Sequence, residues 1–292
     1  MAAARPEQRL YFSVLIPTLG RPDELRSTLE SLLACRPPPD EVIVVDGDSG
    51  RSAEPVANEL RVRYLASEPG LTRQRNAALA AARGEVAVFS DDDVRFDPRV
   101  FAVLADVYKE PVVGATVRVL EPDAHRLGGP RSRLRRLLLG GREGTFTRFG
   151  YPRYVIGDTP QDVEVMPGCF MTARRTAAEE VRFDEKLSGY SLAEDEDFSY
   201  RLSRLGRIRY EPEATVEHRK TGFTERDERV FGRSVVLNRA YLFRKNFRRT
   251  PLARLQFSLL VAGLIGHRLA NREWRGAQGL VEGAVAVLRG RP

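Results

Sequence analysis

Three consecutive carboxylates, Asp91, Asp92 and Asp93, end the apolar, β-favouring stretch in "VAVFSDDDV". Adjacent like charges repel, so such a cluster is either solvated or neutralised by a cation. Carboxylate oxygens are ligands that Mg²⁺ and Mn²⁺ accept. The run therefore indicates a divalent-cation site, and a solvated loop or a helix start before "DPRVF" is the alternative interpretation.

A second group of carboxylates begins a predicted helix in "AEDEDFSYRLSRLG". Glu194, Asp195 and Asp197 lie in its first turn, where the helix dipole alone favours acidic residues. An ionised carboxylate within hydrogen-bond reach of a hydroxyl is also a general base. The acidic residues therefore fit two roles, stabilisation of the helix start and general-base catalysis. The apolar positions expected on this helix are Phe198, Leu202 and Leu205.

The elements that would position these side chains alternate regularly. Short apolar runs predict strands, and amphipathic or alanine-rich segments predict helices. This alternation implies right-handed crossovers and a mostly parallel sheet that is covered on both faces, so the first hundred residues form a doubly wound α/β unit. The predicted strands are 10–17, 41–46, 61–66 and 85–90, and the predicted helices are 21–34, 52–60 and 71–82.

Ligands of such sheets bind beyond the carboxyl ends of the strands. The first strand ends in Pro17 and Thr18, the second in Asp46, and the fourth in the three aspartates. Neither GxGxxG nor GxxxxGK[ST] follows the first strand, so the common glycine-rich phosphate cradles are missing. A nucleotide bound here would need another counter-charge, which a metal on the aspartates would supply.

The composition suits one large α/β core with an appendage. The chain has 292 residues, 42% of them hydrophobic, and 47 Lys and Arg against 40 Asp and Glu, which gives a formal net charge of +7. A positive charge favours anionic partners. The two cysteines, Cys35 and Cys169, indicate neither a disulfide framework nor a zinc site. With no apolar leader near the first residue, we expect a cytoplasmic location.

The C-terminal part predicts a helical extension, so the expected domains are a catalytic domain over 1–220 and the extension over 221–292. A helix over 225–251 contains a basic cluster, an apolar segment over 257–266 is too short to span a bilayer, and a last helix covers 274–288. The extension is expected to contact the inner face of the cell membrane, to pack on the catalytic domain or to form a homodimer. The basic cluster comprises Arg244, Lys245, Arg248 and Arg249.

Six segments in a fixed order carry a family resemblance. They are "VLIPTLGRPDEL", "EVIVVDGDS", "GLTRQRNAALAAARGEVAVFSDDD", "GCFMTARR", "FDEKL" and "AEDEDFSYRL", between Val14 and Glu217. Together they resemble the family 2 glycosyltransferases of GT-A fold. The resemblance implies an α/β, Rossmann-like mixed sheet. It also implies transfer of a sugar, with inversion, from a UDP- or GDP-sugar to a hydroxyl of a glycan or of a lipid-linked acceptor.

The resemblance also implies the donor pocket. Pro17 and Thr18 would touch the nucleotide, and Asp46 would accept an N–H of the base, although a strand-end turn is the alternative role for this aspartate. Arg75 would lie near the base or the phosphates. The segment 120–165, rich in glycine, arginine and aromatic residues, is expected to be a mobile loop over the site or a solvated insertion.

The cation and the catalytic base follow from the same resemblance. Asp93 would bind the divalent cation directly, while Asp91 and Asp92 would hold the ribose or a metal-bound water, and a register that uses Asp92 and Asp93 is the alternative. His218, one of three histidines, would complete the metal site and favour Mn²⁺ over Mg²⁺. Asp195 would remove the proton of the acceptor hydroxyl.

Two other functions compete with this prediction. A sugar-nucleotide nucleotidyltransferase would usually carry a glycine-rich, basic signature after the first strand, whereas "TLGRPDEL" has one glycine and one arginine. A nucleic-acid-binding protein is suggested by the basic charge and by "RSRLRR". Acidic groups at strand ends repel phosphates unless metals intervene, so we expect no nucleic-acid partner.

Overall fold

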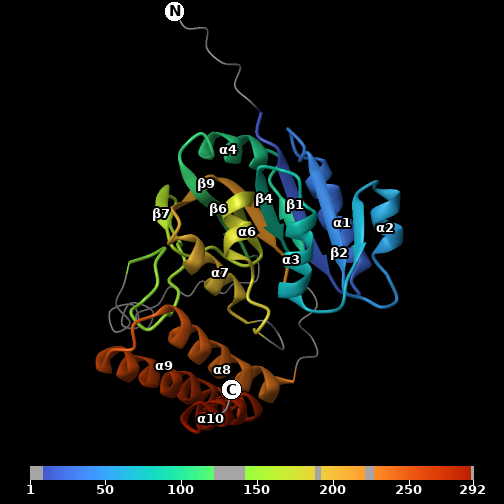
Figure 1. Cartoon of the computed structure of the whole chain (residues 1–292). Helices are drawn as coiled ribbons and strands as arrows, with labels where there is room; N and C mark the ends of the chain where they lie inside the picture. Colours follow the sequence, from blue (N-terminus) through green and yellow to red (C-terminus); the bar gives the residue numbers. More distant parts are fainter. Residues whose placement is uncertain (1–8, 122–141, 188–191, 221–226, 291–292) are drawn as a thin grey trace, which may run out of the picture.

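A nine-stranded mixed sheet forms the centre of the computed structural model, which describes residues 9–121, 142–187, 192–220 and 227–290 (Figure 1). The expected fold class, a mixed α/β sheet with C-terminal helices, is confirmed. Residues 122–141, which hold "RSRLRR" and much of the expected loop over the site, lie outside the described residues.

The first half of the sheet is parallel, as the alternation predicts. Its strands run in the order β3-β2-β1-β4, so the order reverses beside β1. The carboxyl ends of β1 and β4 thus meet at the place where ligands bind to open α/β sheets. The elements are β1 (Phe12–Thr18), α1 (Pro22–Leu33), β2 (Glu41–Asp46), α2 (Glu54–Glu59), β3 (Arg63–Ala66), α3 (Leu71–Ala81) and β4 (Val86–Ser90).

The second half of the sheet mixes directions. The strand β8 is antiparallel to β4 and to β6, while β9 is parallel to β6 and antiparallel to both β5 and β7. Only three residues separate the end of β4 from the start of β5. The pairing of β5 with β9 therefore brings the C-terminal end of β9 close to the carboxyl end of β4. The strands are β5 (Val94–Phe96), β6 (Val112–Leu120), β7 (Gln161–Val163), β8 (Phe170–Arg174) and β9 (Arg207–His218).

Two apolar clusters pack on opposite faces of the sheet. Val14 and Ile16 of β1 face one cluster, together with α1, α2 and α4 (Val100–Val107), whereas Leu15 faces the other, together with α3, α6 (Arg175–Val181) and α7 (Glu194–Leu202). Successive residues of a strand point to opposite faces, so a strand buried on both sides is apolar throughout. This explains the unbroken "VLI" run.

The helix after the second acidic group is shorter than the sequence predicts. Phe198 and Leu202 are buried, but Leu205 lies beyond the end of α7 and is 42% exposed. The expectation that Leu205 belongs to the apolar face is therefore wrong. The chain turns there to enter β9, and a Cβ at Gly206 would come within 2.6 Å of Val113, so the turn needs glycine.

Three helices, α8 (Glu228–Asn246), α9 (Pro251–Ala270) and α10 (Trp274–Leu288), form the C-terminal extension and lie together at one end of the molecule (Figure 1). The helix α9 begins at Pro251, well before the apolar segment, because Thr250 caps it through its hydroxyl and proline suits the first turn. A Cβ at Gly279 of α10 would lie 2.0 Å from the carbonyl oxygen of Arg229, so α8 and α10 are in backbone contact. None of the described helices is long and apolar enough to cross a membrane.

Candidate functional site

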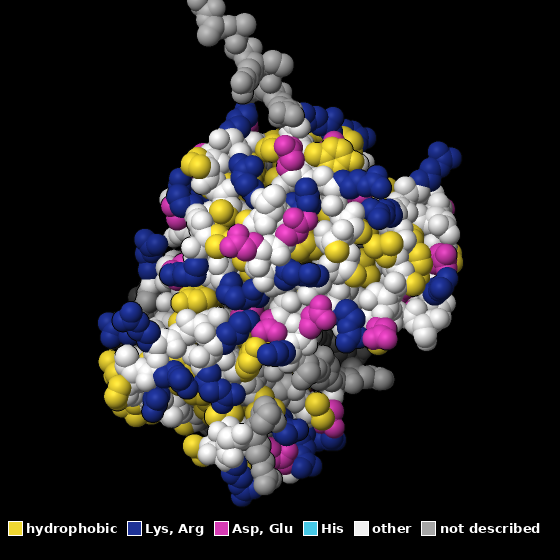
Figure 2. Space-filling model, viewed as in Figure 1, with side chains coloured by type: hydrophobic (Ala, Val, Ile, Leu, Met, Phe, Trp, Pro, Cys, Tyr) yellow, Lys and Arg dark blue, Asp and Glu magenta, His cyan; other side chains and the backbone are white. Residues whose placement is uncertain are grey.

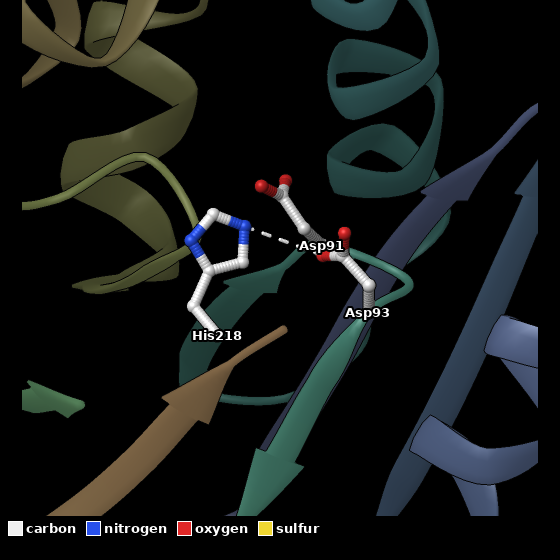
Figure 3. Close-up of side chains that lie close together, drawn as sticks. All are labelled: Asp91, Asp93 and His218. Carbon is white, nitrogen blue, oxygen red and sulfur yellow. Dashed lines mark ion pairs between the residues drawn. The ribbon is translucent and has the colours of Figure 1, made fainter. Parts of the chain in front are cut away.

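The side chains of Asp91, Asp93 and His218 point toward one another at the end of β4 (Figure 3). Val94 of β5 is paired with His218 of β9, and this register brings the imidazole to the aspartates. One ligand atom from each of the three residues lies within 4.8 Å of the others, and His218 Nε2 is 3.4 Å from Asp93 Oδ1. Two carboxylates and an imidazole form a donor set that fits a divalent cation.

The charge around His218 is negative. Burial alone lowers the pKa of His218, but the hydrogen bond to Asp93 and the charges of Asp91, Asp93 and Glu121 outweigh it, so the pKa is raised. Glu121 Oε1 lies 3.7 Å from Nδ1 of the imidazole. The raised pKa favours the protonated imidazole, whereas a metal ligand must be deprotonated, so protonation of His218 and binding of a cation here would compete.

Asp92, the middle carboxylate, is directed away from this cluster. Its Oδ2 accepts hydrogen bonds from the Thr18 hydroxyl at 2.6 Å and from Arg21 Nε at 3.2 Å, and its side chain is 2% exposed. Burial raises the pKa of Asp92 to about 7, although Arg21 and Thr18 oppose the rise. Arg21 also lies 3.3 Å from Asp93 Oδ2. Asp91 and Asp93 therefore lie together with His218, whereas Asp92 is hydrogen-bonded to Thr18 at the end of β1.

Asp46 holds the turn after β2. Thr18 and Asp46 are partners in the β1–β2 register, which places the predicted donor residues of both strands side by side. The Asp46 carboxylate is fully buried and accepts the backbone N–H groups of Asp48 at 2.8 Å and Ala53 at 3.1 Å. It also accepts the Tyr64 hydroxyl at 3.2 Å, and burial together with this carboxylate raises the pKa of Tyr64 to about 12. Whether Asp46 binds a base stays a prediction.

Arg75 connects the aspartate cluster to α7. Its guanidinium, 1% exposed, donates to Asp91 Oδ1 at 2.9 Å, to Glu194 Oε1 at 2.9 Å and to the carbonyl oxygen of Gly168 at 2.8 Å. It also lies 5.2 Å from the centre of the Phe183 ring. In the structure this arginine is therefore a buried bridge between two acidic groups, while its predicted contact with the donor is untested.

The first turn of α7 places Glu194 and Asp195 beside this arginine. Burial and the neighbouring Asp195 charge raise the pKa of Glu194 to about 8, against the effect of Arg75. Burial also raises the pKa of Asp195, whereas Arg75 and the hydrogen bond from Tyr154 lower it. The Tyr154 hydroxyl donates to Asp195 Oδ2 at 3.1 Å. A Cβ at Gly168 would lie 3.1 Å from the same oxygen, so Asp195 packs against bare backbone.

The next two acidic residues of α7 bind the C-terminal extension. Glu196 forms a two-bond ion pair with Arg239 of α8, at 3.0 and 2.9 Å. Asp197 is fully buried and accepts hydrogen bonds from Arg201, from Lys245 at 2.9 Å and from Asn246 at 2.8 Å. Thus Lys245, predicted as part of a basic surface cluster, serves to anchor α8 to α7.

A cavity of about 420 Å³ lies between the aspartate cluster, α7 and α8. Asp91, Glu194 and Asp195 form its acidic wall, while Phe231, Val235, Asn238 and Arg239 of α8 line it from the extension. Gly168 and Cys169 also line it, and burial raises the pKa of the Cys169 thiol well above its usual value. A thiol with a raised pKa is a poor nucleophile, and Cys169 is buried in one of the apolar clusters of the sheet.

Several residues of the site were not predicted from the sequence. Tyr154 lies in "FGYPRYV", within the segment expected to be a loop, and its aromatic residues were the only signal. Arg21 follows the first strand in "TLGRPDEL", where a single arginine beside two predicted donor residues was the only hint. The cavity face of α8 had no local signal, because a helix pattern does not tell what the helix packs against.

The family comparison gives one match and the search of curated proteins gives none. Residues 13–182, more than half of the chain, match the model of the family described as Glycosyl transferase family 2. No curated protein sequence matches the chain.

Solved structures share the fold at low sequence identity. A mannosyltransferase from Pyrobaculum calidifontis, PcManGT, in complex with GDP-Man and Mn²⁺ has a TM-score of 0.61 and 16% identity, over 99% of this chain and 90% of that one. GalNAc-T7 with UDP, GalNAc and Mn²⁺ has a TM-score of 0.59 and 17% identity, over 80% of this chain and 48% of that one. TarS 1–349 of S. aureus in complex with UDP-GlcNAc has a TM-score of 0.55 and 15% identity, over 97% and 93%.

Proposed function

Because the chain belongs to glycosyl transferase family 2 and is a glycosyltransferase of GT-A fold, we propose that it moves a sugar from a nucleoside-diphosphate donor to an acceptor hydroxyl with inversion and with a divalent cation. The observation that carries the proposal is the position of Asp91 and Asp195 on one cavity, where Arg75 bridges Asp91 to Glu194, the residue before Asp195. Three similar structures hold nucleotides or nucleotide sugars, and two of these hold Mn²⁺.

The cation would be held by Asp93 and His218, with Asp91 as the third ligand or as the partner of a bound water. A cation in this place neutralises the negative charge that grows on the departing nucleoside diphosphate. The imidazole nitrogen supports Mn²⁺ over Mg²⁺, which prefers oxygen ligands. The cluster itself, two carboxylates and one imidazole within 4.8 Å, is the support for this assignment.

Asp195 is the proposed general base. It must be ionised to accept the proton of the acceptor hydroxyl, and both Arg75 and Tyr154 favour its ionised form. Burial and the charge of Asp195 raise the pKa of Glu194, so the pair favours a state with a single negative charge, and the hydrogen bond from Tyr154 favours that charge on Asp195. One base that acts on the face opposite the leaving group produces inversion at the anomeric carbon.

The donor would lie across the carboxyl ends of β1, β2 and β4. Pro17, Thr18 and Asp46 are proposed to orient the nucleotide, with Arg75, Asp91 and Asp92 nearby. Thr18 acts together with Asp92 through their 2.6 Å hydrogen bond. Positioning by a preformed set of polar groups removes much of the entropic cost of reaching the transition state. A UDP- or GDP-sugar is the proposed donor, and a glycan or lipid-linked hydroxyl is the proposed acceptor.

A nucleotide-release assay tests the proposal. Purified protein is incubated with Mn²⁺ and either UDP- or GDP-sugars or, in a separate reaction, nucleoside triphosphates with sugar 1-phosphates, and both nucleoside diphosphate and pyrophosphate are measured. We expect release of nucleoside diphosphate that Asp195→Asn lowers by at least about a hundredfold, in the range typical of general-base loss. Formation of pyrophosphate instead would favour the nucleotidyltransferase alternative.

A matched variant and a binding measurement complete the test. Asp106→Asn removes a carboxylate that is 76% exposed on α4 and should leave the rate unchanged. Thermal shifts with UDP or GDP plus Mn²⁺ identify the base, because a ligand of the folded state raises the apparent stability. Asp195→Asn should keep this shift, and a near wild-type transfer rate in that variant would refute the role of Asp195.

Three expectations from the sequence stay predictions. They are the division into a catalytic domain over 1–220 and an extension over 221–292, the cytoplasmic location at the inner face of the cell membrane, and the homodimer. The contacts of Glu196 and Asp197 with α8 favour an extension that packs on the catalytic domain.

A further inference from the structure

The helix α9 is apolar on two opposite faces. One face is packed against α8, α10 and the segment around Phe149, through Ala253, Phe257, Val261 and neighbouring residues. The other face is exposed: Leu252, Leu255 and Leu259, spaced as on one side of a helix, are 50%, 56% and 62% exposed. Exposed leucines that follow one helix face form a patch that water solvates poorly.

The same exposed face is open along the second half of α9. A Cβ added at Gly263 or at Gly266 would meet nothing within 4 Å, and Leu269 is 43% exposed. The exposed stripe therefore runs over most of the 20 residues of α9. Figure 2 shows hydrophobic side chains at the lower left margin of the molecule, in the region of the C-terminal helices, next to Lys and Arg side chains.

Positive charge borders this stripe at both ends. The sequence from Asn246 to Arg272 contains no Asp or Glu. Arg248, Arg249 and Arg254 are exposed at the start of α9, and none of them forms an ion pair with any residue that the structure describes. Arg272 is exposed just after the helix ends. Such a surface matches the phosphates of anionic lipid headgroups above an apolar layer.

We propose that the exposed face of α9 binds an anionic membrane surface, with α9 parallel to the plane of the bilayer. The three leucines enter the boundary between headgroups and acyl chains, and the arginines contact the lipid phosphates. The parallel orientation follows because the opposite face of α9 stays packed on α8 and α10. Membrane binding at this face does not depend on sugar transfer, so it stands or falls separately from the proposed function.

A second copy of the chain is a poorer occupant of the same face. In a two-fold dimer through α9, a parallel arrangement brings the arginine-rich starts of two helices together. An antiparallel arrangement sets Arg248 and Arg249 of one copy near Arg272 of the other. Like charges meet in both cases, and this costs free energy. The charge pattern therefore selects a lipid surface over self-association.

Vesicle sedimentation tests the proposal, with the full chain and without any nucleotide. The vesicles are phosphatidylcholine alone, or phosphatidylcholine and phosphatidylglycerol in equal parts. We expect binding to the anionic vesicles that weakens with added salt. Leu259→Glu should weaken this binding at least about tenfold, because it removes an inserted leucine and adds a charge that resists burial.

Two variants with the same change of charge are the controls. Leu205→Glu, on an exposed leucine far from α9 in the sequence, should bind like the wild type. Leu288→Glu tests the 86% exposed end of α10. The proposal is overturned if the wild type does not bind anionic vesicles, if Leu259→Glu binds as tightly as the wild type, or if Leu288→Glu alone abolishes binding.

Two further measurements separate the remaining explanations. Circular dichroism and the thermal shift with nucleotide and Mn²⁺ show whether Leu259→Glu is folded, and Leu255→Ser repeats the test with an uncharged change. Sedimentation velocity without lipid measures the oligomeric state. A dimer that Leu259→Glu dissociates would assign this face to a second copy and refute the membrane proposal.

Discussion

Replacement of the buried arginine by a side chain of similar length, Arg75→Met, gives a direct test of the acidic core of the site. Arg75 is the shared partner of Asp91 and Glu194, and it is 1% exposed. Removal of one partner of a buried ion pair costs roughly 3–5 kcal/mol, because the remaining charge stays buried without compensation. We therefore expect Arg75→Met to lose about 3–5 kcal/mol of unfolding free energy at alkaline pH, where Glu194 is ionised, and less at neutral pH.

Urea unfolding followed by circular dichroism measures this loss, and α3 supplies a matched control. Arg73, two residues earlier, is half exposed and pairs with Glu68, whose side chain is 81% exposed. Surface ion pairs are worth about 0–1 kcal/mol, so Arg73→Met should cost little. The loss of unfolding free energy in Arg75→Lys should be intermediate between the losses in Arg75→Met and Arg73→Met, since an ammonium keeps the charge but lacks the planar fork that reaches several acceptors.

The pH dependence gives the sharper test. The pKa of Glu194 is raised from 4.5 to about 8 in the folded state, so the folded protein holds a proton that the unfolded chain loses between these values. Stability therefore falls as the pH rises through this window. Without Arg75 the pKa of Glu194 rises further, and the cost of Arg75→Met should grow from acidic to alkaline pH. If Arg75→Met loses less than about 1 kcal/mol of unfolding free energy and this loss does not change with pH, Arg75 does not stabilise the acidic groups as described.

Three further predictions concern the base, its support and the extension. Tyr154→Phe removes a hydrogen bond that lowers the pKa of Asp195, so the acidic limb of the transfer rate should move to higher pH by about half to one unit, measured as a pH–rate profile. Gly168→Ala would press a methyl group onto Asp195, 3.1 Å from Oδ2, and should reduce kcat about tenfold or more in steady-state assays while Mn²⁺ binding is retained. Gly279→Ala would place a Cβ 2.0 Å from a carbonyl oxygen of α8 and should cost about 1–3 kcal/mol, seen as a lower melting temperature. A Cβ at Gly263 would meet nothing within 4 Å, so Gly263→Ala should instead stabilise α9 by up to about 1 kcal/mol. A similar loss of stability in Gly279→Ala and Gly263→Ala would contradict this account of the α8–α10 contact.

Much of the sheet could be predicted because its signals are local. A short apolar run between turn residues indicates a buried strand wherever it occurs, and β2 and β4 were recognised in this way to within one residue. The rule that ligands bind at the carboxyl ends of parallel strands then placed Thr18, Asp46 and Asp91 at one edge. The structure has these strand ends adjacent, since β1 lies between β2 and β4.

The metal cluster required more than a local signal. The sequence suggested His218 only through the resemblance to a family, because a histidine after a strand carries no information about its neighbours. Its approach to Asp93 depends on the pairing of β5 with β9, which are more than a hundred residues apart. The same holds for Tyr154 and for the cavity face of α8, which reach Asp195 and its surroundings only after the chain has folded.

By itself, the sequence determined the family, the order of strands and helices, and the concentration of carboxylates at two points of the chain. Hydrophobic periodicity and motif order are properties of neighbouring residues, so they can be read without a fold. Only the tertiary structure decided how the three aspartates divide. Asp91 and Asp93 turn toward His218, while Asp92 turns toward Thr18 and Arg21. Asp92 and Asp93 lie in the turn between β4 and β5, and the elements packed around this turn determine which carboxylates face a cation and which one supports the strand beside it.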